Sequence, residues 1–226
     1  MNKVLSSVCL KGYYSYIRLK CNARGLRFVP PNYAFFDKLL QGGIVIDVGV
    51  GENPNFTLSL INKYDVESYI IDPTHKHMNA LKEFEKEHSR IHYLPLALGA
   101  KEETRTFYES QSNESGSLRK DHVNVQKDPL ITYDVRVVTL ERLLQHCGNK
   151  AIDIMKIDIE GEEYEFISSI SKNDLQRTKQ LIIEFHHNTV GKYSINETFQ
   201  AINRIKSMGM KAVMYNGRDC LFYWKN

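Results

Sequence analysis

The chain has 226 residues, of which 42% are hydrophobic and 25% are charged. This composition and length predict one folded globular domain, and they exclude a disordered, collagen-like or coiled-coil protein. The net charge is +3, and the sequence contains neither a nucleic-acid-binding motif nor an apolar run of the roughly 18 residues that a transmembrane helix requires.

The N-terminal stretch is strongly basic, because residues 1–27 hold six Lys or Arg and no acidic residue. We expect residues 1–40 to form a basic helical leader that packs through scattered apolar side chains, which are Val4, Leu5, Tyr13, Tyr16 and Ile17. The alternative is a weak peripheral contact of residues 1–27 with anionic lipid or a charged acceptor. The stretch lacks the apolar segment and cleavage site of a signal peptide. The four cysteines form no C-x-x-C pair and predict reduced thiols, so we expect a cytoplasmic protein.

Short apolar runs alternate with helical periods from residue 43 onward, which is the pattern of an α/β domain. The first half of the domain predicts strands at 44–46, 68–71 and 91–98, with helices carrying Phe56–Ile61 and Met78–Phe84 between them. Pro95 removes a backbone donor, so the third strand is predicted at a sheet edge.

Two further strands are predicted at 104–108 and 133–138, on either side of a long polar stretch. Residues 109–132 are rich in Gly, Ser and Asn. A connection this long is either a functional loop that closes over a substrate or a disordered excursion, and the sequence leaves both open.

The second half of the chain continues the alternation. It predicts a short helix at 140–144, a strand at 151–159, a helix at 164–170, a strand at 181–185 and a helix with Phe199, Ile202 and Ile205 on one face. Asn196 is the expected N-cap of that last helix and Gly209 its stop. Asn216-Gly217 predicts a final hairpin between 211–215 and 220–224. We therefore predict a doubly wound, mostly parallel sheet of about seven strands with a C-terminal antiparallel strand, in a single domain over residues 41–226.

Acidic residues follow the predicted strands, at the edge where open α/β sheets bind ligands. They are Asp47, Asp72, Asp158, Glu160 and Glu184. A single such acid is commonly a helix cap or an exposed loop residue, whereas five at one edge repel each other unless a cation is bound there.

The loop after the first strand resembles a dinucleotide-binding loop, but Pro54 stands where a third glycine belongs. Glu52 places negative charge where a pyrophosphate would lie. A cationic ligand without phosphates, S-adenosylmethionine, fits better than a nicotinamide dinucleotide. Asp72, after the second strand, is then placed for its ribose diol.

Three charges alternate along the strand at 151–159 and therefore share a face: Lys156, Asp158 and Glu160. They indicate either a structural ion pair or a prepared site for an acceptor hydroxyl or a metal. His186 is a further candidate for the general base, since its unperturbed pKa suits neutral pH; the neighbouring His187 should face the other way. His75 and His77 are expected on the surface.

These segments resemble the FkbM-type family of S-adenosylmethionine-dependent methyltransferases. The resemblance is carried by Val45-Ile-Asp47-Val-Gly49, Ile71-Asp72-Pro73, Ala97-Leu98-Gly99, Val138-Thr-Leu140, Ile182-Ile183-Glu184, Leu221-Phe222 and, most specifically, Lys156-Ile-Asp158-Ile-Glu160-Gly161-Glu162-Glu163. The sequence departs from the family at Val50–Pro54, and Asp72 replaces the usual Glu. The resemblance implies a Rossmann-like fold and methyl transfer to an oxygen of a sugar, glycan, glycolipid or natural product.

With this resemblance the site residues divide into three groups. We expect the cofactor at Asp47, Gly49, Gly51, Asn53, Asp72, Ala97 and Leu98. We expect catalysis from Lys156, Asp158, Glu160 and His186, and acceptor binding from Ser117, Arg119 and Glu184. We assign no metal ligands, although a divalent cation at Asp158, Glu160 and Glu184 stays open. The alternatives are an inactive, methyltransferase-like binding module and a nicotinamide-dependent oxidoreductase.

Overall fold

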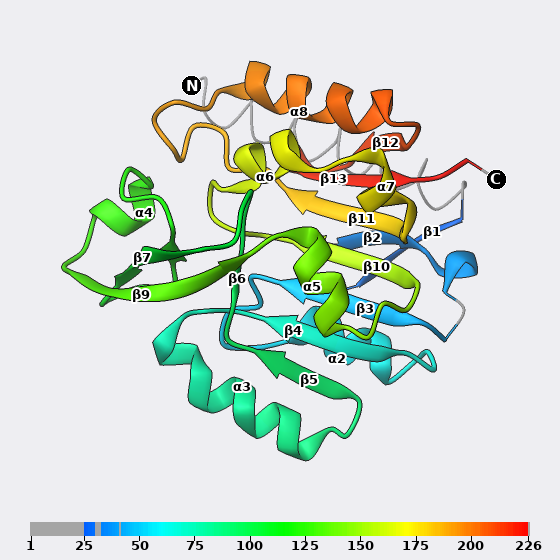
Figure 1. Ribbon diagram of the computed structural model, residues 1–226, viewed down its shortest axis with the longest axis horizontal. Coiled ribbons are helices and arrows are strands. Elements are labelled where there is room, and N and C mark those ends of the chain that lie inside the picture. Colours follow the sequence, from blue (N-terminus) through cyan, green and yellow to red (C-terminus); the bar gives the residue numbers. More distant parts are fainter. Residues whose placement is uncertain (1–24, 30–32, 41, 226) are drawn as a thin grey trace, which may run out of the picture.

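The computed structural model describes residues 25–29, 33–40 and 42–225 and is built around one mixed sheet (Figure 1). Its seven strands lie in the spatial order β12 (Lys211–Met214), β13 (Asp219–Tyr223), β11 (Thr178–Glu184), β10 (Ile152–Ile157), β3 (Ile44–Val48), β4 (Glu67–Ile71) and β5 (Ile91–Leu94). Neighbouring strands from β11 to β5 are parallel, and β13 runs antiparallel to both β11 and β12. The predicted doubly wound sheet, with its antiparallel strand, is confirmed.

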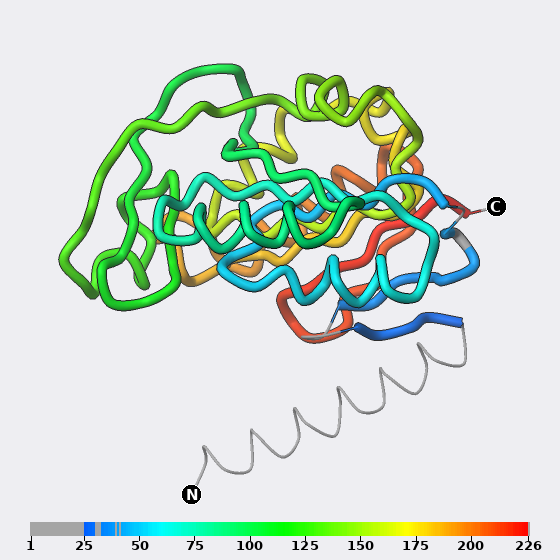
Figure 2. Tube along the Cα trace, turned by 90° about the horizontal axis from the view of Figure 1, so that it is seen from below, coloured from blue at the N-terminus to red at the C-terminus, as the bar shows by residue number. Residues whose placement is uncertain are grey.

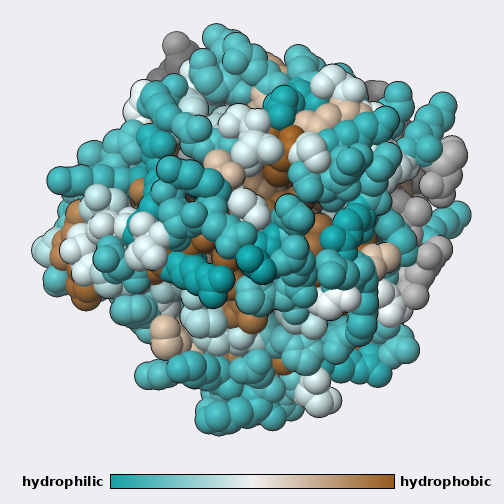
Figure 3. Space-filling model, viewed as in Figure 1, coloured by the Kyte–Doolittle hydropathy of each residue, from teal (hydrophilic) through white to brown (hydrophobic). Residues whose placement is uncertain are grey.

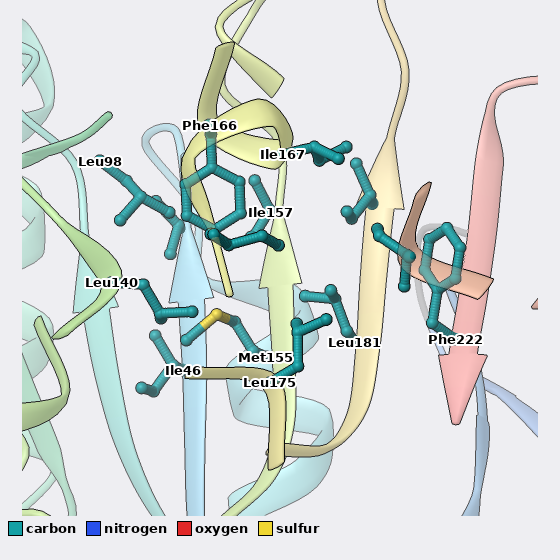
Figure 4. Packing of buried hydrophobic residues seen from close by; sticks show 14 of the residues in the cluster. Ile46, Leu98, Leu140, Met155, Ile157, Phe166, Ile167, Leu175, Leu181 and Phe222 are labelled. Atoms are coloured by element: carbon teal, nitrogen blue, oxygen red, sulfur yellow. The ribbon is translucent and has the colours of Figure 1, made fainter. Parts of the chain in front are cut away.

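Helices cover both faces of the sheet because apolar side chains alternate along its strands. Ile46, Met155 and Leu181 point to one face (Figure 4), which is covered by α5 (Leu140–His146), α6 (Glu163–Ser169), α7 (Lys172–Gln176) and α8 (Ile195–Ser207). Val45 and Ile154 point to the other, which is covered by α2 (Asn55–Ile61) and by α3 (His75–Glu87) over β4 and β5. Figure 2 shows α5 and α2 on opposite sides of the sheet. The face drawn in Figure 3 is mostly hydrophilic, with apolar side chains in small separate groups.

A second, four-stranded sheet stands beside the carboxyl ends of the main sheet (Figure 1). Its order is β6 (Ala97–Leu98), β9 (Leu130–Val138), β7 (Glu103–Ser110) and β8 (Gly116–Ser117). The long polar stretch is therefore folded in part: it holds β8 and the one-turn helix α4 (Val123–Gln126). The strands predicted near 104 and 133 exist but pair with each other outside the main sheet.

The residues that precede the main sheet include a β-hairpin. β1 (Leu26–Val29) and β2 (Tyr33–Phe36) pair antiparallel, and a 3₁₀ turn, η1 (Asp37–Leu39), follows. Leu26 and Phe35 are fully buried against the α2 face of the sheet. The sequence predicts a helical leader here, and this is wrong for these residues, which are extended. The apolar residues 4–17 expected to form the packing face of the leader lie outside the described residues.

Three local predictions differ from the structure. The strand expected over 91–98 is divided at Pro95: β5 ends at Leu94 on the sheet edge, as predicted, and β6 joins the second sheet. The N-cap of α8 is Ser194 rather than Asn196, because Ser194 and Glu197 form a capping box. Phe199 is half-exposed, and Ala201 lies on the buried face of α8 with Ile202 and Ile205.

Candidate active site

A cavity of about 460 Å³ opens at the carboxyl ends of β3, β4 and β10. Its walls come from the loops that follow these strands, from Tyr33 of β2 and from Phe107 and Gly116 of the second sheet. This is the edge at which doubly wound sheets bind ligands, and the volume suits a small organic molecule. The second sheet thus contributes a wall that the chain order alone does not reveal.

The loop after β3 is shaped by two glycines with left-handed backbone conformations. Gly49 has a φ of 73° and Gly51 a φ of 70°. A Cβ on Gly49 would lie 1.6 Å from the carbonyl oxygen of Asp158, so only glycine fits at this crossing of two loops. Around Gly51 the space is open, and its backbone N–H donates to Asp72 Oδ2 at 2.8 Å.

Asp72, at the end of β4, is buried and held rigidly. Its Oδ2 accepts from Gly51 and its Oδ1 accepts from the backbone N–H of Thr74, also at 2.8 Å. A carboxylate offers about four acceptor positions, so two remain for a ligand in the cavity.

His77 lines the cavity with its Nδ1 3.7 Å from Asp72 Oδ1, and the prediction that His77 lies on the surface is wrong. His75 is exposed and stacks on Tyr133, as that prediction required.

Lys156 is a buried cation at the centre of the acidic edge. Its Nζ lies 3.4 Å from Asp47 and 3.4 Å from Asp158, and it donates to the carbonyl of Gly49 at 2.8 Å. Burial lowers the pKa of Lys156, but the charges of Asp47 and Asp158 outweigh it and raise the pKa overall. Burial raises the pKa of Asp47, and Lys156 opposes that shift. Lys156 therefore places one positive charge between two carboxylates of the cavity wall.

Tyr33 connects the hairpin to two of these acids. Its hydroxyl lies 3.4 Å from Asp158 Oδ2 and 3.4 Å from Glu184 Oε2. Burial and the charge of Asp158 raise the pKa of Tyr33, so this hydroxyl keeps its proton and donates it. Burial and Asp158 also raise the pKa of Glu184.

His186 follows β11 and is enclosed by carboxylates. Its Nδ1 contacts Glu163 Oε1, and its Nε2 lies 3.6 Å from Asp158 and 3.5 Å from Glu160. Burial lowers its pKa, yet Glu163, Asp158 and Glu160 together raise the pKa of His186 to about 10. His186 is therefore an imidazolium at neutral pH in this arrangement, which does not suit the general base we expected from its sequence position. His187 faces Thr198 instead.

The left-handed backbone conformation at Glu160 sets the direction of its side chain. Glu160 has a φ of 50°, and Gly161 follows with a φ of 102°. Its Oε2 lies 2.9 Å from Nε2 of His122, a fully buried residue of the segment between β8 and α4. Burial raises the pKa of Glu160, but the proximity of His122 and the charge of His186 produce a net lowering.

All seven residues expected at the cofactor line the cavity: Asp47, Gly49, Gly51, Asn53, Asp72, Ala97 and Leu98. Of the residues expected to be catalytic, Lys156, Asp158 and Glu160 line it, and His186 lies directly behind the last two.

The three residues expected at the acceptor lie outside the cavity lining. Ser117 donates to the carbonyl of Glu160 at 2.7 Å, and Arg119 pairs with Asp121 at 3.1 Å. Glu184 faces the Tyr33 hydroxyl. Other residues of the same polar stretch do reach the cavity, namely Glu114, Ser115, Gly116 and Leu118.

Residues 29–211 match the Methyltransferase FkbM domain family, and the chain belongs to that family. The match confirms the prediction of an S-adenosylmethionine-dependent methyltransferase. It begins inside the stretch that we assigned to the leader, so β2 with Tyr33 lies within the matched region. No curated protein matches the chain significantly.

Several solved structures resemble the chain at low identity. Methanococcus jannaschii fibrillarin, a pre-rRNA processing protein, is 11% identical with a TM-score of 0.47, over 89% of this chain and 71% of that one. Aeropyrum pernix fibrillarin with bound S-adenosyl-L-methionine is 8% identical with a TM-score of 0.44, over 82% and 67%. The N-terminal domain of human METTL16 in complex with SAH is 11% identical with a TM-score of 0.43, over 96% and 69%.

Proposed function

We propose that this protein transfers the methyl group of S-adenosylmethionine to a hydroxyl oxygen of a sugar, glycan, glycolipid or natural-product acceptor. The observation that carries the proposal is the division of the cavity edge into two acidic parts. Asp72 lies at one part, beside the glycine loop, whereas Asp158 and Glu160 lie at the other, next to the second sheet.

The cofactor fits the part that contains Asp72. Its ribose diol donates to the free acceptor positions of the Asp72 carboxylate, whose orientation Gly51 and Thr74 fix. Its sulfonium and ammonium groups are cationic, which suits a cavity also lined by Asp47 and Glu52. Leu96, Ala97 and Leu98 supply the apolar wall that an adenine ring requires.

The acceptor hydroxyl lies at the part that contains Asp158 and Glu160. Methyl transfer needs the oxygen, the methyl carbon and the sulfur in line, with a base to take the hydroxyl proton. We assign the proton to one of these two carboxylates, since His186 carries its own proton at neutral pH. Lys156 holds Asp158 in place. In the reaction, the carboxylate that takes the hydroxyl proton loses its negative charge.

The alternatives are less well supported. A nicotinamide dinucleotide would bring its pyrophosphate to the glycine loop, where Glu52 lines the cavity. An inactive binding module would not need to keep Lys156 buried between Asp47 and Asp158, because an ion pair of this kind is expensive to bury.

The decisive experiment is transfer of an isotope-labelled methyl group from S-adenosylmethionine to an extract of cells that make this protein, followed by mass spectrometry of the labelled product. We expect an O-methyl group on a carbohydrate or natural product, absent when a chain with both Asp158→Asn and Glu160→Gln replaces the wild type. Label in protein or nucleic acid would refute the acceptor class. No label from a chain that binds the cofactor in calorimetry would favour the inactive module.

We further propose a small-molecule or glycan partner and a cytoplasmic location. Cys147 and Cys220 are free and buried, which supports a reducing compartment. None of the helices in the described ranges has both the length and the apolar composition needed to cross a bilayer.

A further inference from the structure

Four side chains from three distant parts of the sequence converge behind the acidic wall of the cavity. We call this cluster the two-histidine site; it consists of Asp158, Glu160, His122 and His186. One ligand atom each from Asp158, Glu160 and His186 lies within 4.8 Å of the others. The two imidazole rings have centroids 5.9 Å apart and face the same carboxylate.

Three of the distances between neighbouring ligand atoms in this cluster approach those of a coordination shell. Ligand atoms about 2.1 Å from one ion, at tetrahedral or octahedral angles, lie about 3.0 to 3.4 Å from each other. Glu160 Oε2 lies 2.9 Å from Nε2 of His122 and 3.5 Å from Nε2 of His186. Nε2 of His186 lies 3.6 Å from Asp158 Oδ1. A modest contraction around one ion therefore satisfies all three spacings.

His122 provides independent evidence that a ligand belongs here. It is fully buried, and neither of its ring nitrogens has a hydrogen-bond partner of good geometry among the described residues, although Glu160 is close. Leaving a buried imidazole unsatisfied is costly. Its position is not accidental, because the segment is fixed by a bridge between His122 and Val190 and by the bond from Val123 N to the carbonyl of Thr189.

Glu163 orients the second histidine in the way that metal ligands are commonly oriented. It is fully buried, and its Oε1 contacts Nδ1 of His186 on the ring edge that faces away from the cluster. This contact keeps the proton of Nδ1 in place, so an ion that binds at Nε2 displaces the second proton of the imidazolium from that nitrogen. The same carboxylate oxygen accepts from the backbone N–H of Gly161, which anchors it to the turn after Glu160.

We propose that the two-histidine site binds one divalent first-row transition-metal ion. Two imidazoles with two carboxylates favour Zn²⁺, Mn²⁺, Fe²⁺ or Co²⁺ over Mg²⁺ and Ca²⁺, which take oxygen ligands. The ligand set differs from the three carboxylates considered from the sequence, because Glu184 faces Tyr33 and the histidines replace it. Asp158 contributes Oδ1, which leaves Oδ2 to Lys156 and Tyr33.

The site also adjoins the proposed acceptor position, since Asp158 and Glu160 belong to both. An ion there would bind an acceptor oxygen and lower the pKa of its hydroxyl. That role rests on the proposed function, whereas metal binding itself does not, and the experiment below measures binding without any methyl transfer.

The test uses the full, untagged chain, stripped with a chelator and reconstituted separately with Zn²⁺, Co²⁺ and Mg²⁺. We expect about one Zn²⁺ or Co²⁺ per chain by elemental mass spectrometry after gel filtration, with Mg²⁺ well below that, and visible absorption from Co²⁺ bound to nitrogen ligands. Less than about a tenth of an equivalent of each transition ion, or stoichiometric Mg²⁺ alone, would overturn the proposal.

Variants locate the ion. His122→Ala should abolish binding, and Glu163→Gln should weaken it about 10- to 100-fold because it loosens His186. The matched control is His92→Ala, which removes a histidine that pairs with Glu67 at 2.9 Å on the far part of the sheet. Circular dichroism checks that each variant folds. If His122→Ala does not fold, His122→Asn, which retains more of the side-chain volume, is used in its place. Binding that survives in folded His122 variants would place the metal elsewhere.

Discussion

Gly49 and Asp158 touch through their backbones: a Cβ on Gly49 would lie 1.6 Å from the Asp158 carbonyl oxygen. The contact joins the loop after β3, which we assign to the cofactor, to the loop after β10, which carries the carboxylates. The two strands are hydrogen-bonded neighbours, and the amide of Asp158 donates to the carbonyl of Val48 at 3.0 Å. The spacing between cofactor loop and acidic wall is therefore set by backbone rather than by side chains.

Gly49→Ala should destabilise the fold severely. The new methyl group cannot be accommodated without separating the loops after β3 and β10, so we expect a loss of at least about 3 kcal/mol in the free energy of unfolding. Gly51→Ala is the matched control, because Gly51 has the same left-handed conformation but open space around it. It should cost only about 1 to 2 kcal/mol. Urea unfolding would compare them, and equal losses would contradict the steric explanation.

Lys156→Met should destabilise the protein by about 3 to 5 kcal/mol, because it leaves Asp47 buried without its cation. Adding Asp47→Asn to the same chain should recover part of the loss, since the uncompensated charge is then removed. Trp224 is the chain's only tryptophan, and its indole N–H donates to the Thr178 carbonyl at the edge of β11, so its emission reports unfolding. A double variant less stable than Lys156→Met would show that the pair is not coupled.

The sequence predicted the acidic edge because its signals are local. Asp47, Asp72 and Asp158 each end an apolar run, and the parallel sheet brings such ends together whatever the loops do. The alternation of charges also placed Lys156 and Asp158 near one another correctly, at 3.4 Å. That Lys156 contacts two acids at once follows from the tertiary structure, because it depends on the register between β3 and β10.

The rest of the site depends on contacts that no local pattern encodes. His122 is a single histidine in a polar stretch, and it reaches Glu160 only because the second sheet folds that stretch back over the end of β10. Tyr33 lies in a segment whose Tyr-Ala-Phe-Phe run was an available strand signal, but the basic charge around it favoured a leader. His77 was expected on the surface because no third ligand is tied to His75 and His77 by spacing, yet His77 is buried and lines the cavity.

The stability of the protein should decrease with pH through the titration of Asp219. Burial, Glu184 and Asp158 raise the pKa of Asp219 from 3.8 to about 8, and Asp219 lies directly opposite Glu184 on the neighbouring strand. Between these values the unfolded chain has lost the proton that the folded chain keeps. The folded state then binds more protons, so the free energy of unfolding falls as pH rises from about 4 to 8, by at most about 1.4 kcal/mol per pH unit, and levels off above.

Asp219→Asn removes the contribution of Asp219 to the pH dependence of stability. It leaves unchanged the charged groups around Asp219, which are Glu184, Asp158, Lys156 and His186. The variant stays neutral at every pH, so its stability relative to wild type should increase steadily across the same interval. Urea unfolding at several pH values gives that difference directly. A difference that is constant with pH would mean that Asp219 is ionised in the folded protein near its ordinary pKa.

Asp72→Asn should weaken S-adenosylmethionine binding by about 10- to 100-fold, because hydrogen bonds to a charged acceptor contribute about 1.5 to 3 kcal/mol. The amide has one acceptor oxygen, so it cannot accept from both Gly51 and Thr74 while also binding a ribose diol. Asp134→Asn is the control, since that exposed carboxylate accepts from Thr106 in the second sheet. Calorimetry with S-adenosylmethionine measures the change, and an unaltered Kd in Asp72→Asn would mean that the ribose binds elsewhere and that our cofactor placement is wrong.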